Sequence, residues 1–369
     1  MPLNKSSRSA KMDIIRIFAL FTVNCVHFFL FSNLYEQPVN SFPVYFAVIL
    51  RTLFMICVPL FIILSGYLMK NKKLGKSYYF GIVKTLSIYI LASAATYLYR
   101  TLYLKENISI LSFGTGILDF SIAPYAWYVE MYIGLFLLIP FLNLAYNGLE
   151  SKKQRKILVL TMIFITAAPS ILNIWNFSNP AFFLSPSSFE HYNRLIPQWW
   201  TGMYPITFYF IGCYLRDYGL GLSKIKNAVL AVFCVILGGI FNIYRSYPNP
   251  FSGGIWQDWG SLINVINSTL IFNLMLNIND AKIPQKILKP LSKLSNLVFG
   301  AYLMSWVFDD LFYSIFLSDT QLYSMKIKYI LFIPALTFVC SLAVSFVLNL
   351  IYSFAKKIIR TILQTKNST

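Results

Sequence analysis

Residues 14–34 read IIRIFALFTVNCVHFFLFSNL, a run that is almost entirely apolar. Because a helix needs about 20 such residues to cross the hydrocarbon core of a bilayer, this run predicts a transmembrane helix. It is too long for the apolar region of a typical cleaved signal peptide, and no small-residue cleavage site follows it. Two ionisable side chains, Arg16 and His27, lie within the run.

Similar apolar runs recur along the whole chain. Of its 369 residues, 57% are hydrophobic and 12% are charged, whereas a soluble domain is about 25% charged. We therefore predict an all-α, polytopic integral membrane protein with about ten transmembrane helices. No long polar stretch is available for a second domain, so we expect residues 1–369 to form a single membrane domain. The predicted spans are 14–34, 44–69, 78–104, 126–146, 157–175, 203–218, 227–244, 260–278, 297–317 and 329–354.

The distribution of basic residues predicts the orientation of these spans. The termini and the loops between the spans fall alternately on the two sides of the membrane. The segments on one side hold 22 lysine and arginine residues, and those on the other side hold five. The positive-inside rule places the richer set, and with it both termini, in the cytoplasm. We interpret the formal net charge of +18 as a sign of topology in a multi-pass protein of the cell membrane, and we expect no nucleic-acid partner. The basic loops could still attract anionic lipid headgroups or a phosphorylated cytoplasmic substrate.

Several common kinds of site have no signature in the sequence. The five cysteines all fall within predicted spans, so we expect no structural disulfide. No metal-ligand spacing and no phosphate-binding glycine loop is present, and we expect no metal ion. The longest outer loop, about 176–202, could cover a site or simply seal the helix ends. The sequence sets no oligomeric state.

Ionisable residues inside a span are costly, so each is a candidate for function. Arg16 and His27 are eleven residues apart, which places them on one helix face and about 16 Å apart along the axis. Asp13 shares this face with Arg16 at the cytoplasmic rim. Taken singly, Arg16 could reach the headgroups and His27 could bond to a neighbouring helix. Their common face instead favours a continuous polar track through the membrane.

Four further charged residues lie at similar depths in the outer halves of their spans. They are Arg51, Glu130, Asp309 and Asp310. Because an unpaired buried charge is too costly, we expect Arg51 to pair with one of the three carboxylates in an outer-half cavity. The alternative is that Arg51 and an acid merely hold two helices together. Lys84, in the inner half of the third span, is expected to extend toward the headgroups.

Four motifs follow one another along the chain. Asp13 and Arg16 are followed by His27 in an Arg-x10-His pattern; the others are VPLFIILSGY at 58–67, AWYVEMY at 126–132 with Pro140 after it, and SNLVFGAYL at 295–303. With this set, covering residues 13–305, the chain resembles the acyltransferase 3 family of membrane proteins. One position departs from the family. Many members have a second histidine after the last motif, where this chain has Met304-Ser305, and Asp309 or Asp310 could take its place.

The resemblance implies a transferase that moves an acyl group, most often acetyl, from cytoplasmic acyl-coenzyme A. The acceptor would be a hydroxyl of a cell-surface carbohydrate or of its lipid-linked precursor. Asp13 and Arg16 would then bind the donor, and His27, the only histidine in a predicted span, would act as base or nucleophile. Arg51 could stabilise the developing oxyanion, and Glu130, Asp309 or Asp310 could orient the imidazole.

Two other classes of protein fit the same polar track. A secondary transporter also needs charged residues near the midplane, although no inverted repeat is evident in the sequence. A catalytically inactive scaffold in surface-polymer synthesis is the third interpretation. Consumption of acetyl-coenzyme A distinguishes an acyltransferase from the transporter and the scaffold.

Overall fold

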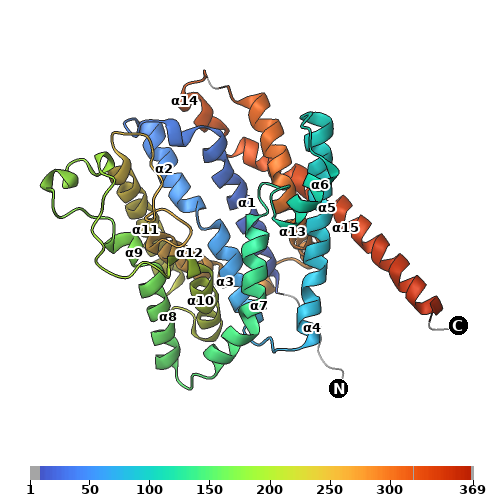
Figure 1. The fold of residues 1–369 in the computed structure, drawn as a ribbon. Coiled ribbons are helices and arrows are strands. Elements are labelled where there is room, and N and C mark those ends of the chain that lie inside the picture. Colours follow the sequence, from blue (N-terminus) through green and yellow to red (C-terminus); the bar gives the residue numbers. More distant parts are fainter. Residues whose placement is uncertain (1–8, 319, 367–369) are drawn as a thin grey trace.

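A computed structural model describes residues 9–318 and 320–366, and these form an all-helical bundle (Figure 1). The all-α prediction is thus confirmed. The α-helices are α1 (Ala10–Phe31), α2 (Phe42–Phe54), α3 (Cys57–Met69), α4 (Lys76–Tyr79), α5 (Val83–Leu98), α6 (Ile110–Leu118), α7 (Trp127–Asn147), α8 (Lys152–Thr166), α9 (Pro169–Leu172), α10 (Tyr204–Tyr218), α11 (Lys224–Ser246), α12 (Leu262–Leu276), α13 (Gln285–Phe316), α14 (Tyr323–Lys326) and α15 (Phe332–Lys366).

Each predicted span coincides with one of these helices or with a run of them. Within the described residues, six helical stretches are long and apolar enough to cross a membrane by length and composition. They are Ala10–Phe31, Phe42–Met69, Lys76–Tyr103, Trp127–Asn147, Lys224–Ser246 and Phe332–Ile362. The helices α8, α10 and α12 have 15 residues each, or roughly 22 Å of rise, which is short of the hydrocarbon core. The count of ten crossings and the cytoplasmic termini therefore stay predictions.

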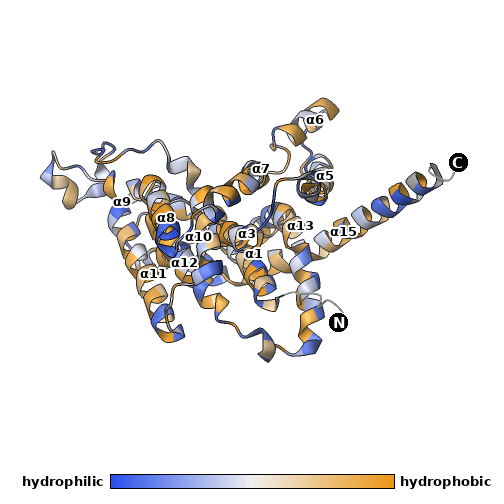
Figure 2. Ribbon diagram, turned by 90° about the horizontal axis from the view of Figure 1, so that it is seen from below, coloured by the Kyte–Doolittle hydropathy of each residue, from blue (hydrophilic) through white to orange (hydrophobic). Residues whose placement is uncertain are grey.

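Helix α1 lies between two groups of helices. It contacts α2, α3 and α12 on one side and α13 and α15 on the other. Viewed from below, α1 and α3 occupy the middle of the bundle, and the C-terminal end of α15 projects away from it (Figure 2). Because α1 carries Arg16 and His27, this central position surrounds both side chains with residues from several helices.

The predicted span 44–69 is divided into α2 and α3 because of Pro59. A proline has no N–H to donate to the carbonyl four residues earlier, which here belongs to Met55. The side-chain amide of Asn264 in α12 donates to that carbonyl at 2.9 Å. A proline also removes a backbone hydrogen bond in α7, where Pro140 leaves the carbonyl of Phe136 without its partner in the helix. The Tyr78 hydroxyl donates to it, so neighbouring helices satisfy both freed groups as an apolar medium requires.

Two glycines bring α3 and α10 into backbone contact. A Cβ atom on Gly66 would lie 2.0 Å from the Tyr209 carbonyl oxygen, and one on Gly212 would lie 2.0 Å from the Ile63 carbonyl oxygen. Such small residues allow helices to approach closely where no hydrophobic effect drives them together. The glycine of the LSGY motif is therefore required by packing.

Candidate active site

The deepest polar contact of α1 is made by His27. Its Nδ1 lies 2.9 Å from the Oδ2 atom of Asp309 in α13, which is completely buried. The imidazole retains a small exposed area, with 14% of the side chain accessible. A carboxylate at Nδ1 fixes the proton on that nitrogen and leaves Nε2 able to accept one. His27 and Asp309 therefore form a dyad of the kind that general-base catalysis uses.

Two further side chains hold the carboxylate of this dyad. Tyr125, just before α7, donates its hydroxyl to the same Oδ2 atom at 2.9 Å, and Thr337 of α15 donates to Oδ1 at 3.1 Å. The Tyr125 ring also lies against the imidazole, with ring centroids 3.9 Å apart. Three hydrogen bonds thus hold this buried carboxylate, and the carboxylate in turn holds His27 in one orientation.

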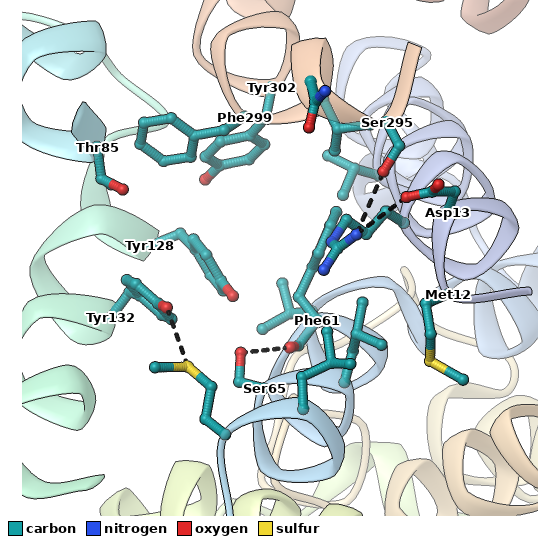
Figure 3. A pocket seen from close by; sticks show the side chains of 18 of the residues that line it. Met12, Asp13, Phe61, Ser65, Thr85, Tyr128, Tyr132, Ser295, Phe299 and Tyr302 are labelled. Atoms are coloured by element: carbon teal, nitrogen blue, oxygen red, sulfur yellow. Dashed lines mark hydrogen bonds and ion pairs between the residues drawn. The ribbon is translucent and has the colours of Figure 1, made fainter. Parts of the chain in front are cut away.

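A cavity of about 650 Å³ opens at the other end of α1, a volume within the range of small-molecule sites. Its charged side chains lie at the end beside Asp13 and Ser295, which we call the mouth (Figure 3). Arg16 donates through Nη1 to Asp13 at 3.2 Å and to the Ser295 hydroxyl at 3.3 Å. Asp13 is buried, whereas 30% of the Arg16 side chain is accessible. Asp13 and Arg16, which were predicted to share a helix face, therefore contact each other and line the cavity.

The interior of the cavity is apolar and partly aromatic. Phe61, Tyr128, Tyr132, Phe299 and Tyr302 line it, and Figure 3 shows their rings arranged around the open space. These residues come from three of the four sequence motifs. The mouth and interior together would suit a ligand with an anionic head and a slender, weakly polar arm.

The cavity and the dyad are joined by two tyrosines. Tyr302 lines the cavity, and its hydroxyl donates to the Tyr125 carbonyl, while the Tyr125 hydroxyl bonds to Asp309. His27 itself is not among the lining residues. In this conformation the two tyrosines therefore lie between the cavity and the His27–Asp309 dyad.

Arg51 does not join this site. Its Nε donates to the Tyr35 hydroxyl at 2.8 Å, and its guanidinium lies 5.4 Å from the Tyr35 ring centroid and 5.1 Å from that of Phe251. Within residues 9–318 and 320–366, no carboxylate lies within 4.0 Å of it. The predicted pairing of Arg51 with a carboxylate is therefore wrong. Aromatic faces and a phenol offset the cost of burial instead.

A carboxylate in the loop before α12, that of Asp258, interacts electrostatically with Arg51. Desolvation in that loop raises the pKa of the Asp258 carboxyl, and the Arg51 charge opposes the rise. Through Tyr35 and Phe251, Arg51 holds residues 34–36 and the loop after α11 against α2. These contacts give Arg51 a structural role, with aromatic side chains in place of the acid that the alternative interpretation named.

The other two candidate carboxylates are also outside the dyad. Asp310 accepts a hydrogen bond from the Tyr99 hydroxyl at 2.8 Å. Tyr99 lies in a π-helical turn that extends α5. Glu130 is exposed in the first turn of α7, where a negative charge is favoured by the helix dipole. Of the four outer-half charges, the structure thus brings only Asp309 to His27.

Comparison with protein families gives one decisive match. The profile described as an acyltransferase domain, that of acyltransferase 3, matches residues 9–353. The chain belongs to the acyltransferase 3 family. The resemblance inferred from the four motifs is confirmed, and a membrane acyltransferase in general is supported. No curated protein and no solved structure matches the chain.

Within this acyltransferase, the loop 176–202, which is predicted to lie outside the cell, is held by a buried arginine. The Arg245 guanidinium lies 4.2 Å from the Trp256 ring centroid and 5.0 Å from that of Tyr192, and it donates to the Ile174 carbonyl at 3.0 Å. These contacts join the loop to α11 and to the segment before α12. The loop is therefore fixed to its neighbouring segments in this conformation, and its two expected roles stay predictions.

Sequence reasoning missed three side chains of the site. Tyr125 directly precedes the AWYVEMY motif and Tyr302 lies within the last motif, so their positions beside motifs were a usable signal. Thr337 had no such signal, because a threonine on a transmembrane helix commonly bonds within its own helix. Only the packing of α15 against α1 and α13 shows its role in this acyltransferase.

Proposed function

We propose that this acyltransferase moves an acyl group, most often acetyl, from cytoplasmic acyl-coenzyme A to a hydroxyl of a cell-surface carbohydrate or its lipid-linked precursor. The observation that carries the proposal is the His27–Asp309 dyad close to a cavity with a polar mouth. Membership of the family supports acyl transfer, and the chemistry of the site supports the choice of residues.

The reaction needs a base at the acceptor. In the proposed step, His27 Nε2 takes the proton of the acceptor hydroxyl, whose oxygen forms a bond to the thioester carbonyl carbon. The carbon–sulfur bond then breaks, and the imidazolium returns the proton to the thiolate of coenzyme A. Asp309 stabilises the imidazolium during this step. In the covalent variant, Nε2 itself attacks the thioester carbonyl carbon, the carbon–sulfur bond breaks and coenzyme A leaves as the thiolate. The acceptor hydroxyl then displaces the acyl group from His27, and its proton goes to that thiolate.

The donor would enter at the mouth of the cavity. A guanidinium offers planar paired donors that suit phosphate oxygens, so Arg16 would hold the diphosphate of coenzyme A. Asp13 and Ser295 keep that guanidinium in place. The arm and the acyl group would then extend along the aromatic interior toward Tyr302.

The proposal requires that a side chain between the cavity and the dyad moves. His27 does not line the cavity in this conformation, so the Tyr302 side chain must turn aside for the thioester to reach Nε2. The hydrogen bond from Tyr302 to Tyr125 and the packing of its buried ring against Tyr125 and Tyr128 oppose this rotation. The hydrogen bond alone contributes roughly 1 kcal/mol. Donor binding in the cavity could offset such a cost.

The proposal is tested with isotope-labelled acetyl-coenzyme A. Membrane vesicles that contain the chain should transfer label to a glycan or lipid-linked fraction and should release free coenzyme A thiol. Vesicles from the same cells without the chain are the control. Equal thiol release in both preparations, with no labelled acceptor, would contradict the proposal and favour the transporter or scaffold interpretation.

A further inference from the structure

The C-terminal part of α15 extends well beyond the bundle. At 1.5 Å per residue this 35-residue helix is roughly 50 Å long, whereas the hydrocarbon core is about 30 Å thick. Figure 2 shows its last turns projecting away from the other helices. A segment of this length outside the bundle must interact with lipid, with water or with both.

The projecting turns separate apolar from basic side chains. At 100° per residue, the exposed Ile351, Phe354, Ile358, Ile359 and Ile362 fall within an arc of about 140°. The basic residues Lys356, Lys357 and Arg360 fall on the opposite side, within an arc of about 100°. Helices with this pattern lie at membrane interfaces, with the apolar face toward the acyl chains.

The basic side forms a groove with α5. A groove of about 550 Å³ is lined by Lys84 together with Lys356, Lys357, Arg360, Asn349 and Ser353, among others. None of these four cations lies within 4.0 Å of a carboxylate in the described part of the chain. Four like charges in one groove repel each other, so an anionic ligand there would be strongly favoured.

We propose that this groove binds the phosphate group of an anionic phospholipid. The four cations supply N–H donors for phosphate oxygens, and basic pockets beside membrane helices are suited to such headgroups. The exposed apolar face of the same turns decides between lipid and a soluble phosphate, because the acyl chains of a lipid layer would cover it. This lipid site is separate from the cavity at Arg16, and it goes beyond the proposed acyl transfer.

The test uses the purified full chain and defined lipids. The chain is mixed with equal amounts of phosphatidylglycerol and phosphatidylcholine, and the lipids that stay bound are counted by native mass spectrometry. In the triple variant Lys356→Gln/Lys357→Gln/Arg360→Gln, the preference for phosphatidylglycerol should fall at least tenfold, since each basic side chain near the surface is worth about fivefold in affinity. The control, Lys152→Gln/Lys153→Gln, removes charge at the exposed start of α8 and should change the preference little.

A second variant keeps the test valid if the triple variant does not fold. Lys84→Gln lies on another helix and should lower the preference about fivefold by itself. An unchanged preference in both groove variants, or an equal loss in the α8 control, would overturn the proposal. A weaker affinity for coenzyme A with unchanged phosphatidylglycerol binding would also overturn it, because the groove would then serve a soluble phosphate. The readout needs no catalysis, so it is independent of the proposed function.

Discussion

Replacing Asp309 by asparagine tests the dyad while preserving its shape. The carboxylate accepts from His27 and Tyr125 at Oδ2 and from Thr337 at Oδ1. An asparagine can keep its amide oxygen on the side of His27 and Tyr125 and turn its NH2 toward Thr337. The threonine hydroxyl can then accept from that NH2, because a hydroxyl both donates and accepts. The variant should therefore retain the proton on Nδ1 and lose only the negative charge.

The expected loss follows from that charge. A hydrogen bond to an ionised group is worth roughly 1.5–3 kcal/mol, and each 1.36 kcal/mol is tenfold in rate. Asp309→Asn should thus slow acyl transfer by about 10- to 100-fold. Tyr125→Phe keeps the ring against the imidazole and removes one donor from the carboxylate, so we expect a loss of roughly tenfold.

The double variant Asp309→Asn/Thr337→Val extends the test. Valine cannot accept from the amide, so the NH2 is left without a partner and the double variant should be slower than Asp309→Asn. Thr337→Val alone removes one donor from the carboxylate and should, like Tyr125→Phe, cost roughly tenfold. The rate is measured as labelled acetyl transfer in vesicles. Asp310→Asn, bonded to Tyr99, is the matched control. Equal rates for Asp309→Asn and Asp310→Asn would refute the role of the dyad.

Three other predictions concern the donor, the packing and the topology. Arg16→Ala should raise the KM for acetyl-coenzyme A with a smaller effect on kcat, and Arg16→Lys should restore it only in part, because lysine lacks the guanidinium fork; an unchanged KM would contradict donor binding there. Gly212→Ala should lower the melting temperature of the purified protein, since overpacking costs about 1–3 kcal/mol, whereas Gly134→Ala, with nothing within 4 Å of the new Cβ, should not. Cysteine labels in 147–156 should be shielded from impermeant reagents in intact cells and labels in 176–202 should react, and the reverse result would overturn the orientation.

Much of the fold follows from the sequence because lipid permits few backbone structures. Apolar runs of sufficient length must become helices, and each of the ten runs did so. The break between α2 and α3 was missed, although Pro59 was visible within the run. The short helix α6, between the third and fourth predicted spans, was missed as well, because its nine residues are too few for a crossing.

The site was predictable only where its residues lie on one helix. The contact of Asp13 with Arg16 follows from their spacing of three residues, and the common face of Arg16 and His27 follows from helix geometry. His27 and Asp309 are 282 residues apart, and their equal depth was the only indication of a contact. Depth gives neither the rotation of a helix nor its neighbours. For this reason Arg51, at the same depth, was wrongly expected to pair with a carboxylate.

The central claim is that His27 carries out acyl transfer. The most direct measurement compares label transfer from acetyl-coenzyme A by vesicles that contain the wild-type chain, His27→Ala or His191→Ala. His191 is the other histidine of the chain and is exposed in the outer loop, so its replacement should leave the rate unchanged. His27→Ala should lose at least about 10²–10⁴ in rate, while the protein stays inserted and binds acetyl-coenzyme A with unchanged affinity. Near-normal transfer by His27→Ala would contradict the assignment.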